Sequence, residues 1–422
     1  MRYIARNRLP FGHEELSAAF LPFYAPDEIL GDLNERIKSY IGCSDVKLFN
    51  KGRTALYIAL RAINVGPGDS VICPSLSCLV VPEMILKAGA RPVLIDVDPE
   101  TFTIDVEKIK EELDNTTKAI IPIHLFGHPA EMKPIMDIAN DNNIYVIEDS
   151  AQAMGAKYKN KKVGSFGHAS IFSLGHGKNI STMEGGILTI NDESLRKSVN
   201  KIYNSLDSVR FNKAFSNFIK QVGYSILSHP SLYILTQSRI DKIAESRDKR
   251  ILKNTEDLYH NKYFIIQDEI SRINELTASI AMAQFKKLNY FNKRRIENAE
   301  FFSKRIKHEG FLIPRVANNC KHVFLRYAIR IQKNELGLTR NEIAKIFKSN
   351  RIDVETPYLY VKEHNKLYWN FTKNKSFEVS DELINSIICL PVHPCMNEYD
   401  LKRVLDIISQ FGSISEPIKS EK

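Results

Sequence analysis

The stretch Phe172-Ser-Leu-Gly-His-Gly-Lys178-Asn-Ile-Ser-Thr-Met-Glu-Gly-Gly186 places a lysine between glycines, directly after an apolar run. Upstream, Glu148-Asp149-Ser150-Ala151-Gln152 also follows an apolar run. Because the chain has 59 lysines and arginines, and most such residues are solvated surface groups, Lys178 alone indicates little. Together with a carboxylate and a hydroxyl in this arrangement, it is what a pyridoxal phosphate enzyme needs.

Residues 45–200 alternate short apolar runs with helical stretches. The runs are apolar throughout, as expected for strands buried on both faces of a parallel sheet. We predict strands at 71–73, 92–96, 119–123, 144–147, 169–172 and 186–190, separated by helices such as 54–63, 83–87 and 132–140. This pattern predicts an α/β fold with a mainly parallel sheet, whose ligand lies beyond the carboxyl ends of the strands. Asp149 and Ser173 both fall at such ends.

Composition is typical of a folded globular protein. Of the 422 residues, 43% are hydrophobic and 26% charged, enough for a large core and about two domains. Residues 1–8 lack the apolar core of a secretory signal, and the longest apolar stretch, around 222–235, falls short of the roughly 20 residues that a spanning helix needs. The six cysteines are scattered, with no Cys-x-x-Cys pair. We therefore expect reduced thiols in a cytoplasmic protein, with no metal site.

The formal net charge of +9 would suit an anionic partner, such as a nucleotide diphosphate, a nucleic acid or a lipid surface. A generally basic surface without a specific partner explains the charge equally well. Since no aromatic-interleaved nucleic-acid motif is present, we do not expect nucleic-acid binding.

The composition of the chain changes near residue 202, where basic and aromatic residues become frequent. Between residues 210 and 253 there are nine basic and three acidic residues, and Phe211, Phe215, Phe218 and Val222 recur at helical spacing. The first interpretation is an insertion, residues 210–260, that packs on its own domain or on a partner subunit. The second is a basic amphipathic element that makes a weak contact with a membrane surface or with a lipid-linked substrate.

Three short segments could hold a cofactor. Gly52 and Thr54 open an apolar helix, and the free backbone N–H groups there form an anion site together with the helix dipole. Asp149 could simply cap the next helix. Paired with Lys178, it could instead hold a pyridine nitrogen protonated while the lysine forms a Schiff base and acts as general base at the substrate Cα. Ser173 could hydrogen-bond the phosphate.

Many motifs occur in one order along the chain: Gly52-Arg-Thr-Ala-Leu56, Gly66-Pro-Gly-Asp-Ser-Val-Ile-Cys-Pro-Ser75, Gly89-Ala-Arg-Pro-Val-Leu-Ile-Asp96, His124-Leu-Phe-Gly127, Ile147-Glu-Asp-Ser-Ala-Gln-Ala153, Glu184-Gly-Gly186, Arg272-Ile-Asn-Glu-Leu276 and Leu390-Pro-Val-His393. With these motifs, residues 50–407 resemble the DegT/DnrJ/EryC1/StrS family of pyridoxal phosphate-dependent sugar aminotransferases. The resemblance implies the fold-type I aminotransferase architecture, which has a large domain with a mainly parallel sheet flanked by helices and a smaller C-terminal α+β domain. We assign residues 1–290 to the large domain, 291–412 to the small domain and 413–422 to a flexible tail.

The resemblance also implies a role for each matching position. Lys178 takes the place of the Schiff-base lysine, and Asp149 that of the residue at the pyridine nitrogen. Gln152 matches the residue beside the phenolic oxygen of the cofactor, and Ser173 with the Gly52-Arg53 turn matches the phosphate cradle.

The resemblance to the family also implies the substrates and the oligomeric state. Arg272 matches an arginine that reaches the active site, toward the carboxylate of the amino donor. Family members are homodimers in which each site is completed by the neighbouring subunit. We therefore expect a homodimer that binds an amino acid and an activated ketosugar.

The chain departs from the family pattern at three places. Cys78 stands where many members have an aromatic ring over the cofactor. The segment Ile270-Ser271 lacks the asparagine that gives an inter-subunit phosphate contact, and Gly175-His176-Gly177 replaces the more usual His-Pro-Thr. His176 is then either a hydrogen-bond donor to the substrate or a plain loop histidine. All three departures indicate a divergent branch.

The leading hypothesis is an aminotransferase that moves an amino group from a donor, with glutamate expected, to a keto carbon of a nucleotide-activated sugar. Related sugar dehydratases have a histidine in place of the lysine, and Lys178 argues against that reaction. One alternative is a cofactor-binding regulatory or sensor protein on the same scaffold. Another is an enzyme that acts on a lipid-linked sugar at the membrane surface.

Overall fold

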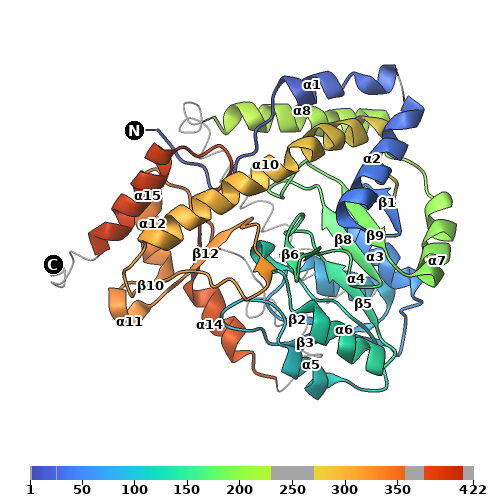
Figure 1. Cartoon of the computed structure of the whole chain (residues 1–422), viewed down its shortest axis with the longest axis horizontal. Helices are drawn as coiled ribbons and strands as arrows, with labels where there is room; N and C mark the ends of the chain where they lie inside the picture. Colours follow the sequence, from blue (N-terminus) through green and yellow to red (C-terminus); the bar gives the residue numbers. More distant parts are fainter. Residues whose placement is uncertain (1, 25, 230–269, 357–374, 412–422) are drawn as a thin grey trace, which may run out of the picture.

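A seven-stranded sheet forms the centre of the large domain (Figure 1). The structure is a computed structural model that describes residues 2–24, 26–229, 270–356 and 375–411. The strand order is β1 (Asp45–Phe49), β9 (Gly186–Ile190), β8 (Ala169–Ser173), β5 (Tyr145–Asp149), β4 (Thr117–Ile120), β2 (Ser70–Pro74) and β3 (Arg91–Ile95). Neighbouring strands from β8 to β3 are parallel, whereas β9 runs antiparallel to both β8 and β1. This confirms the predicted mainly parallel sheet.

Both faces of this sheet are covered by helices. Alternate strand residues point to opposite faces: Ile147 and Ile171 pack with α3 (Gly52–Ala62) and α4 (Val80–Ala88). On the other face, Val146 packs against α6 (Met132–Asp141), and Phe172 packs with α2 (Pro26–Ile41) and α10 (Glu275–Arg305). The remaining large-domain helices in the described part of the chain are α1 (His13–Ala18), η1 (Leu21–Phe23), α5 (Val106–Glu112), η2 (Leu125–Gly127), α7 (Glu193–Asn204) and α8 (Phe211–Leu227).

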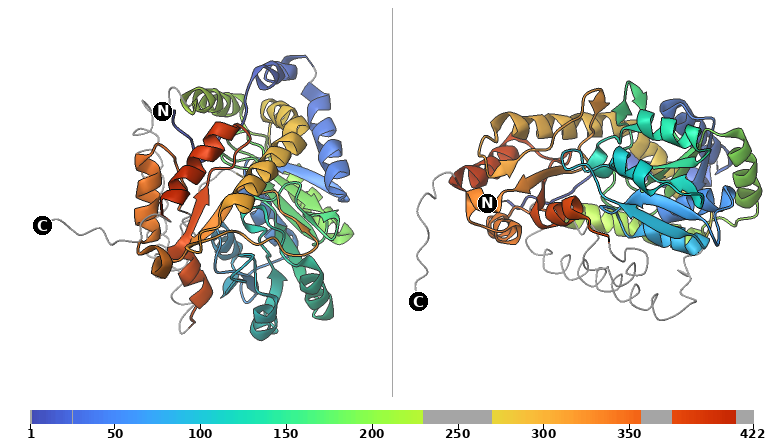
Figure 2. Two further views of the ribbon diagram at one scale, coloured as in Figure 1. Left: turned by 60° about the vertical axis from the view of Figure 1, so that its left-hand side comes forward. Right: turned by 90° about the horizontal axis from the view of Figure 1, so that it is seen from below.

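A smaller α+β unit follows at the other end of the molecule (Figure 2). Its antiparallel sheet has the order β10 (Phe311–Leu312), β12 (Tyr327–Ile331) and β13 (Ile387–Leu390). Its helices are α11 (Lys333–Leu336), α12 (Arg340–Ser349), α14 (Glu378–Ser386) and α15 (Glu398–Gln410). A third, short sheet joins the two units, because β11 (Cys320–Lys321) pairs with β6 (Lys157–Tyr158), which pairs with β7 (Lys161–Lys162). Helix α10 runs through residue 290, so the two units also share one helix.

The basic, aromatic insertion begins with a helix, as its spacing predicts. In α8, Phe218 and Ala214 are buried with Leu276 and Ile280 of α10, whereas Phe211 and Phe215 are about half exposed. The described part of the insertion therefore packs on its own chain, and residues 230–260 lie outside the described residues, as does the tail 413–422. Among the described helices, none is long and apolar enough to span a lipid bilayer.

A buried carboxylate fixes the carboxyl end of β5. Glu148 accepts hydrogen bonds from the backbone N–H groups of Gly164 (2.7 Å), Phe166 (2.9 Å) and Gly167 (2.8 Å). Its fourth partner is His124 Nε2, at 3.0 Å from Oε2. The His124 Nδ1 atom accepts from the Ala130 N–H at 2.9 Å, so the proton resides on Nε2, which donates to Glu148. Four donors thus converge on one fully buried side chain.

We predict that Glu148→Gln destabilises the fold by about 2–4 kcal/mol, because the new amide N–H2 group would face donors instead of accepting from them. A lower midpoint of urea unfolding, followed by far-UV circular dichroism, checks this. Glu107→Gln is the matched control, since the side chain of Glu107 is exposed and pairs with the surface lysine Lys110. Equal midpoints for the two variants would contradict the role given to Glu148.

Candidate active site

A cavity of about 740 Å³ opens at the carboxyl edge of the sheet. Asp149 is the last residue of β5 and Ser173 the last of β8, and Lys178 lies in the loop between β8 and β9. Gly52 and Arg53 open α3. Every site residue predicted from the sequence except Arg272 lines this one cavity: Gly52, Arg53, Cys78, Asp149, Gln152, Ser173, His176 and Lys178. Residues from four separate segments (52–53, 78, 149–152 and 173–178) therefore meet at the edge where the pattern of strands places a ligand.

Lys178 and Asp149 influence each other's charge inside the cavity. Burial lowers the pKa of the Lys178 amine, and the nearby Cys78 and Asp149 oppose this shift. Burial raises the pKa of Asp149, against a hydrogen bond from the Ala151 N–H (3.0 Å) and the charge of Lys178. A lowered lysine pKa increases the fraction of neutral amine at physiological pH, and the neutral amine is the nucleophile that attacks a carbonyl.

The start of α3 and the end of β8 form an anion cradle. A Cβ atom added at Gly52 would lie 3.2 Å from Ser173 Cβ, so the glycine lets the first turn of the helix approach the Ser173 side chain. The Ser173 Oγ atom also accepts from the Gly175 N–H at 3.2 Å, which holds the hydroxyl at the cavity. Backbone N–H groups at a helix N-terminus, a hydroxyl and the Arg53 guanidinium suit a phosphate group.

Gln152 is oriented by the loop that follows β4. Its Oε1 atom accepts from the Phe126 N–H at 3.1 Å, and Phe126 itself has a left-handed backbone with φ of 56°. The amide of Gln152 is therefore held in one orientation at the cavity wall, which suits a contact with an edge of a planar ring.

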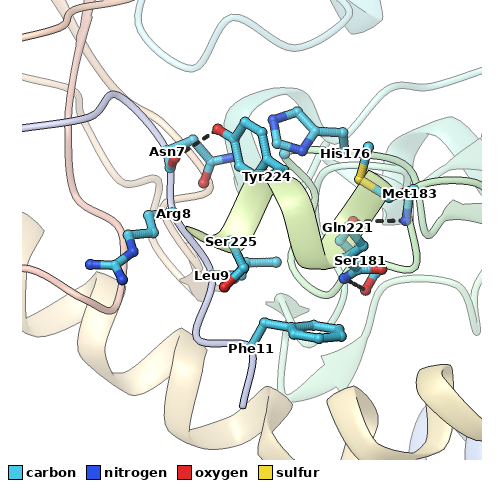
Figure 3. A pocket seen from close by; sticks show the side chains of 11 residues that line it. Asn7, Arg8, Leu9, Phe11, His176, Ser181, Met183, Gln221, Tyr224 and Ser225 are labelled. Carbon is cyan, nitrogen blue, oxygen red and sulfur yellow. Dashed lines mark hydrogen bonds between the residues drawn. The ribbon is translucent and has the colours of Figure 1, made fainter. Parts of the chain in front are cut away.

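Cys78 and His176, two of the residues that differ from the family pattern, also line the cavity. Cys78 is exposed there and lies close enough to Lys178 to affect its charge. The His176 ring meets the Tyr224 ring of α8 edge-on, with 4.1 Å between centroids (Figure 3). His176 thus forms part of the wall between the lysine loop and α8.

Arg272 lies elsewhere in the single chain. Its backbone bridges to Phe49 and Ser208, and its guanidinium lies over the Tyr203 ring, 5.6 Å from the centroid. It is not among the residues that line the cavity, and its contact with the amino donor stays a prediction.

Two charged residues of the small domain lie near Lys178. The sequence patterns do not reveal either of them. Arg326 forms an ion pair with Glu355 and donates from Nη1 to the carbonyl oxygen of Gly177 at 3.3 Å. Arg326 further lowers the pKa of Lys178, and Glu355 acts in the opposite direction. Burial pushes the pKa of Glu355 upward, but Arg326 and Arg6 hold it below its usual value. No local motif marks either residue, because Arg326 is about 150 residues away from Gly177 in the sequence and approaches it only in the folded chain.

These residues fit pyridoxal 5'-phosphate. A buried carboxylate, a partly buried lysine and an amide line the cavity walls, and a glycine, a serine and an arginine form the anion cradle. The donor set thus matches the three polar parts of the cofactor, namely a pyridine nitrogen, a carbonyl with its neighbouring oxygen, and a phosphate.

Comparison with known proteins agrees with this fit. Residues 28–409 match the DegT/DnrJ/EryC1/StrS aminotransferase family. GDP-perosamine synthase of Caulobacter vibrioides is 27% identical over 382 residues, which cover 90% of this chain and 89% of that protein. The dTDP-3-amino-3,6-dideoxy-alpha-D-galactopyranose transaminase of Aneurinibacillus thermoaerophilus is 28% identical, with 90% and 89% covered.

A solved structure extends the likeness to three dimensions. The aminotransferase TlmJ of Streptoalloteichus hindustanus superposes with a TM-score of 0.76 at 19% identity, covering 97% of this chain and 99% of that one. At this identity the likeness shows the fold, and it confirms the predicted architecture. Since the family match spans most of the chain, the protein is a pyridoxal phosphate-dependent aminotransferase that belongs to the DegT/DnrJ/EryC1/StrS aminotransferase family.

Proposed function

We propose that the protein transfers an amino group from an amino acid donor, glutamate, to the keto group of a nucleotide-activated sugar in the biosynthesis of a cell-surface polysaccharide or a related amino sugar. The observation that carries this proposal is the meeting of Lys178, Asp149 and the α3 anion cradle in one cavity of about 740 Å³. The cavity extends past these residues to α8, which leaves room for a substrate larger than an amino acid. Relatives of the chain are named as aminotransferases of nucleotide sugars.

Pyridoxal phosphate, when bound, supplies an electron sink for the bonds at the substrate Cα. Asp149 would accept a hydrogen bond from the protonated pyridine nitrogen, and burial strengthens that pairing because few water molecules screen it. The α3 N–H groups, Arg53 and Ser173 would hold the phosphate, while Gln152 would lie beside the phenolic oxygen. Cys78 would contact the face of the ring where an aromatic side chain stands in many relatives.

Lys178 performs the proton transfer in this proposal. Its amine would hold the cofactor in the absence of substrate, and as a free amine it would take a proton from the donor Cα and return one on the way to the product. A neutral amine is required for both tasks, and burial together with Arg326 favours that state. Arg272 would reach the donor carboxylate if a second subunit completes the site, so we also propose a homodimer that acts in the cytoplasm.

A regulatory protein that binds the cofactor without turnover is the alternative of a different class. The presence of Lys178, Asp149 and Gln152 in the same cavity supports turnover, since binding alone needs neither the proton-transfer lysine nor its partner carboxylate. An enzyme for lipid-linked sugars depends on residues of the insertion that mostly lie outside the described part of the chain.

The direct test follows the two half-reactions of the holoenzyme. Glutamate should convert the visible absorption of the lysine-bound cofactor to that of the aminated form, and a nucleotide-linked ketosugar should restore it. In Lys178→Ala the absorption of the lysine-bound cofactor should be absent. Glutamate should convert the added cofactor to the aminated form at least about 10³-fold more slowly than in the wild type, because the base is gone. Lys133→Ala, at an exposed lysine outside the cavity, is the control. Full activity of Lys178→Ala, or no conversion of the wild type with any amino donor, would refute the mechanism.

A second prediction concerns the ion pair behind Lys178. In Arg326→Leu the pKa of Lys178 should rise, because a cation that lowers it is removed while the opposing Glu355 remains. Capture of pyridoxal phosphate by the apoenzyme, followed by visible absorption, should then require a higher pH.

Two further substitutions separate charge from structure. Arg326→Lys keeps the positive charge and should retain the wild-type pH profile, although it loses the paired contacts with Glu355 and the Gly177 carbonyl. Glu355→Gln should shift the profile the other way, toward lower pH. If Arg326→Leu and the wild type capture pyridoxal phosphate with the same pH dependence, the Arg326–Glu355 ion pair acts only on stability.

A further inference from the structure

Helix α8, the described start of the insertion, forms one wall of the active-site cavity. Asn217 and Lys220 line the large cavity, whereas Gln221 and Tyr224 line a second, water-sized cavity of about 20 Å³ next to it (Figure 3). His176 and Met183 of the lysine loop line both cavities. The insertion thus contributes side chains beside the reacting centre.

The helix is held in place by contacts along its inner face. Gln221 is 6% exposed and donates from Nε2 to the carbonyl oxygen of Ser181 at 2.7 Å. Tyr224 packs against His176 and donates from its hydroxyl to the Asn7 carbonyl oxygen at 3.3 Å. Because Asn217 and Lys220 lie within about one turn of these anchors, their backbone positions at the cavity are fixed.

A chain of polar contacts connects α8 with the anion cradle. Lys51, which precedes Gly52, places Nζ 4.0 Å from Oε1 of Glu184. Asn217 donates from Nδ2 to Oε2 of the same carboxylate at 3.1 Å, and Lys220 Nζ lies 3.4 Å from Asn217 Oδ1. All four side chains line the large cavity. Only Lys51 pairs with the Glu184 carboxylate, whereas the Lys220 ammonium bonds the Asn217 amide oxygen. These four side chains therefore contribute two positive charges and one negative charge to this part of the wall.

We propose that Lys220, Asn217 and Lys51 bind the diphosphate of the nucleotide-activated sugar. This inference rests on the proposed function. Asp149, Lys178 and the α3 cradle are occupied by the cofactor, so the acceptor must lie outward from them, with its keto carbon inside and its anionic end toward α8. Ammonium groups on flexible stems bind phosphate oxygens as point charges, and an amide adds a directed hydrogen bond.

The carboxylate of the amino donor is the other anion that must enter this cavity. The two anions are distinguished by the half-reaction in which they take part. If the residues bind the diphosphate, their substitution should affect only the second half-reaction and should weaken the binding of inorganic pyrophosphate. If they bind the donor carboxylate, their substitution should affect the first half-reaction.

The test compares holoenzymes of Lys220→Ala, Lys220→Glu and the control Lys213→Ala, whose lysine is on the same helix but does not line the cavity. We expect the KM for the ketosugar nucleotide to rise about fivefold in Lys220→Ala, and further in Lys220→Glu, since an exposed ammonium contributes modestly. The glutamate half-reaction should be unchanged in all three. Inorganic pyrophosphate should bind the wild type and Lys213→Ala in calorimetry, and should bind Lys220→Glu more weakly.

An unchanged KM for the acceptor in Lys220→Glu, or a rise in the glutamate requirement instead, would overturn the subsite. The pyrophosphate measurement needs no turnover, so it separates this inference from the function on which it rests. If pyrophosphate binding depends on Lys220 while no ketosugar is aminated, the substrate assignment fails and the anion subsite stands. If the variants aminate a ketosugar as well as the wild type does, the function stands and the subsite fails.

Discussion

The alternation of side chains at the end of β5 is the constraint on which the active site depends. Successive residues of a strand point to opposite faces, so Glu148 and Asp149 cannot enter the same environment. Glu148 turns to the far side, where three backbone N–H groups and His124 Nε2 satisfy a fully buried carboxylate. Asp149 turns into the cavity toward the cofactor position. The well-bonded first carboxylate thereby helps to hold the second one, together with the backbone hydrogen bonds that join Asp149 to Pro122 and His124.

The chemistry of the cavity follows from charges that offset one another under partial burial. Each of Lys178 and Asp149 would be driven toward its neutral form by burial, and each limits this effect on the other. Arg326 and Glu355 form a second such pair, contributed by the small domain. Because Arg326 donates to the Gly177 carbonyl oxygen, the small domain affects both the position and the protonation of the lysine. Docking of the two units is therefore part of assembling the site.

Much of the fold and of the cofactor site could be predicted from local sequence. Apolar runs followed by Asp149 and by Ser173 mark strand ends, and parallel strands bring such ends to one edge. Strand β1 differs from the predicted strands, which are apolar throughout, because Asp45 and Lys47, paired at 3.0 Å, alternate with apolar residues. Such alternation is typical of a half-buried strand, and β1 lies at the edge of the sheet. The reversed direction of β9 depends on tertiary pairing. The apolar residues at helical spacing predict a helix over 270–288, but α10 begins at Glu275, because the Asn274 side chain caps it through the Thr277 N–H.

Residues that come from distant segments could not be predicted, among them those that pack against the loop before Lys178. Chemistry in such a fold is fixed by strand ends, whereas specificity resides in the loops around them. In the Gly175-His176-Gly177 segment, His176 packs against Tyr224 of α8. Gly177 has a φ of +78°, and a Cβ atom there would lie 2.9 Å from Asn7 Nδ2. A proline or threonine would disturb this loop. The loop and the helix therefore form one unit, in which the residues before Lys178 pack against the wall that α8 contributes beside the cofactor position.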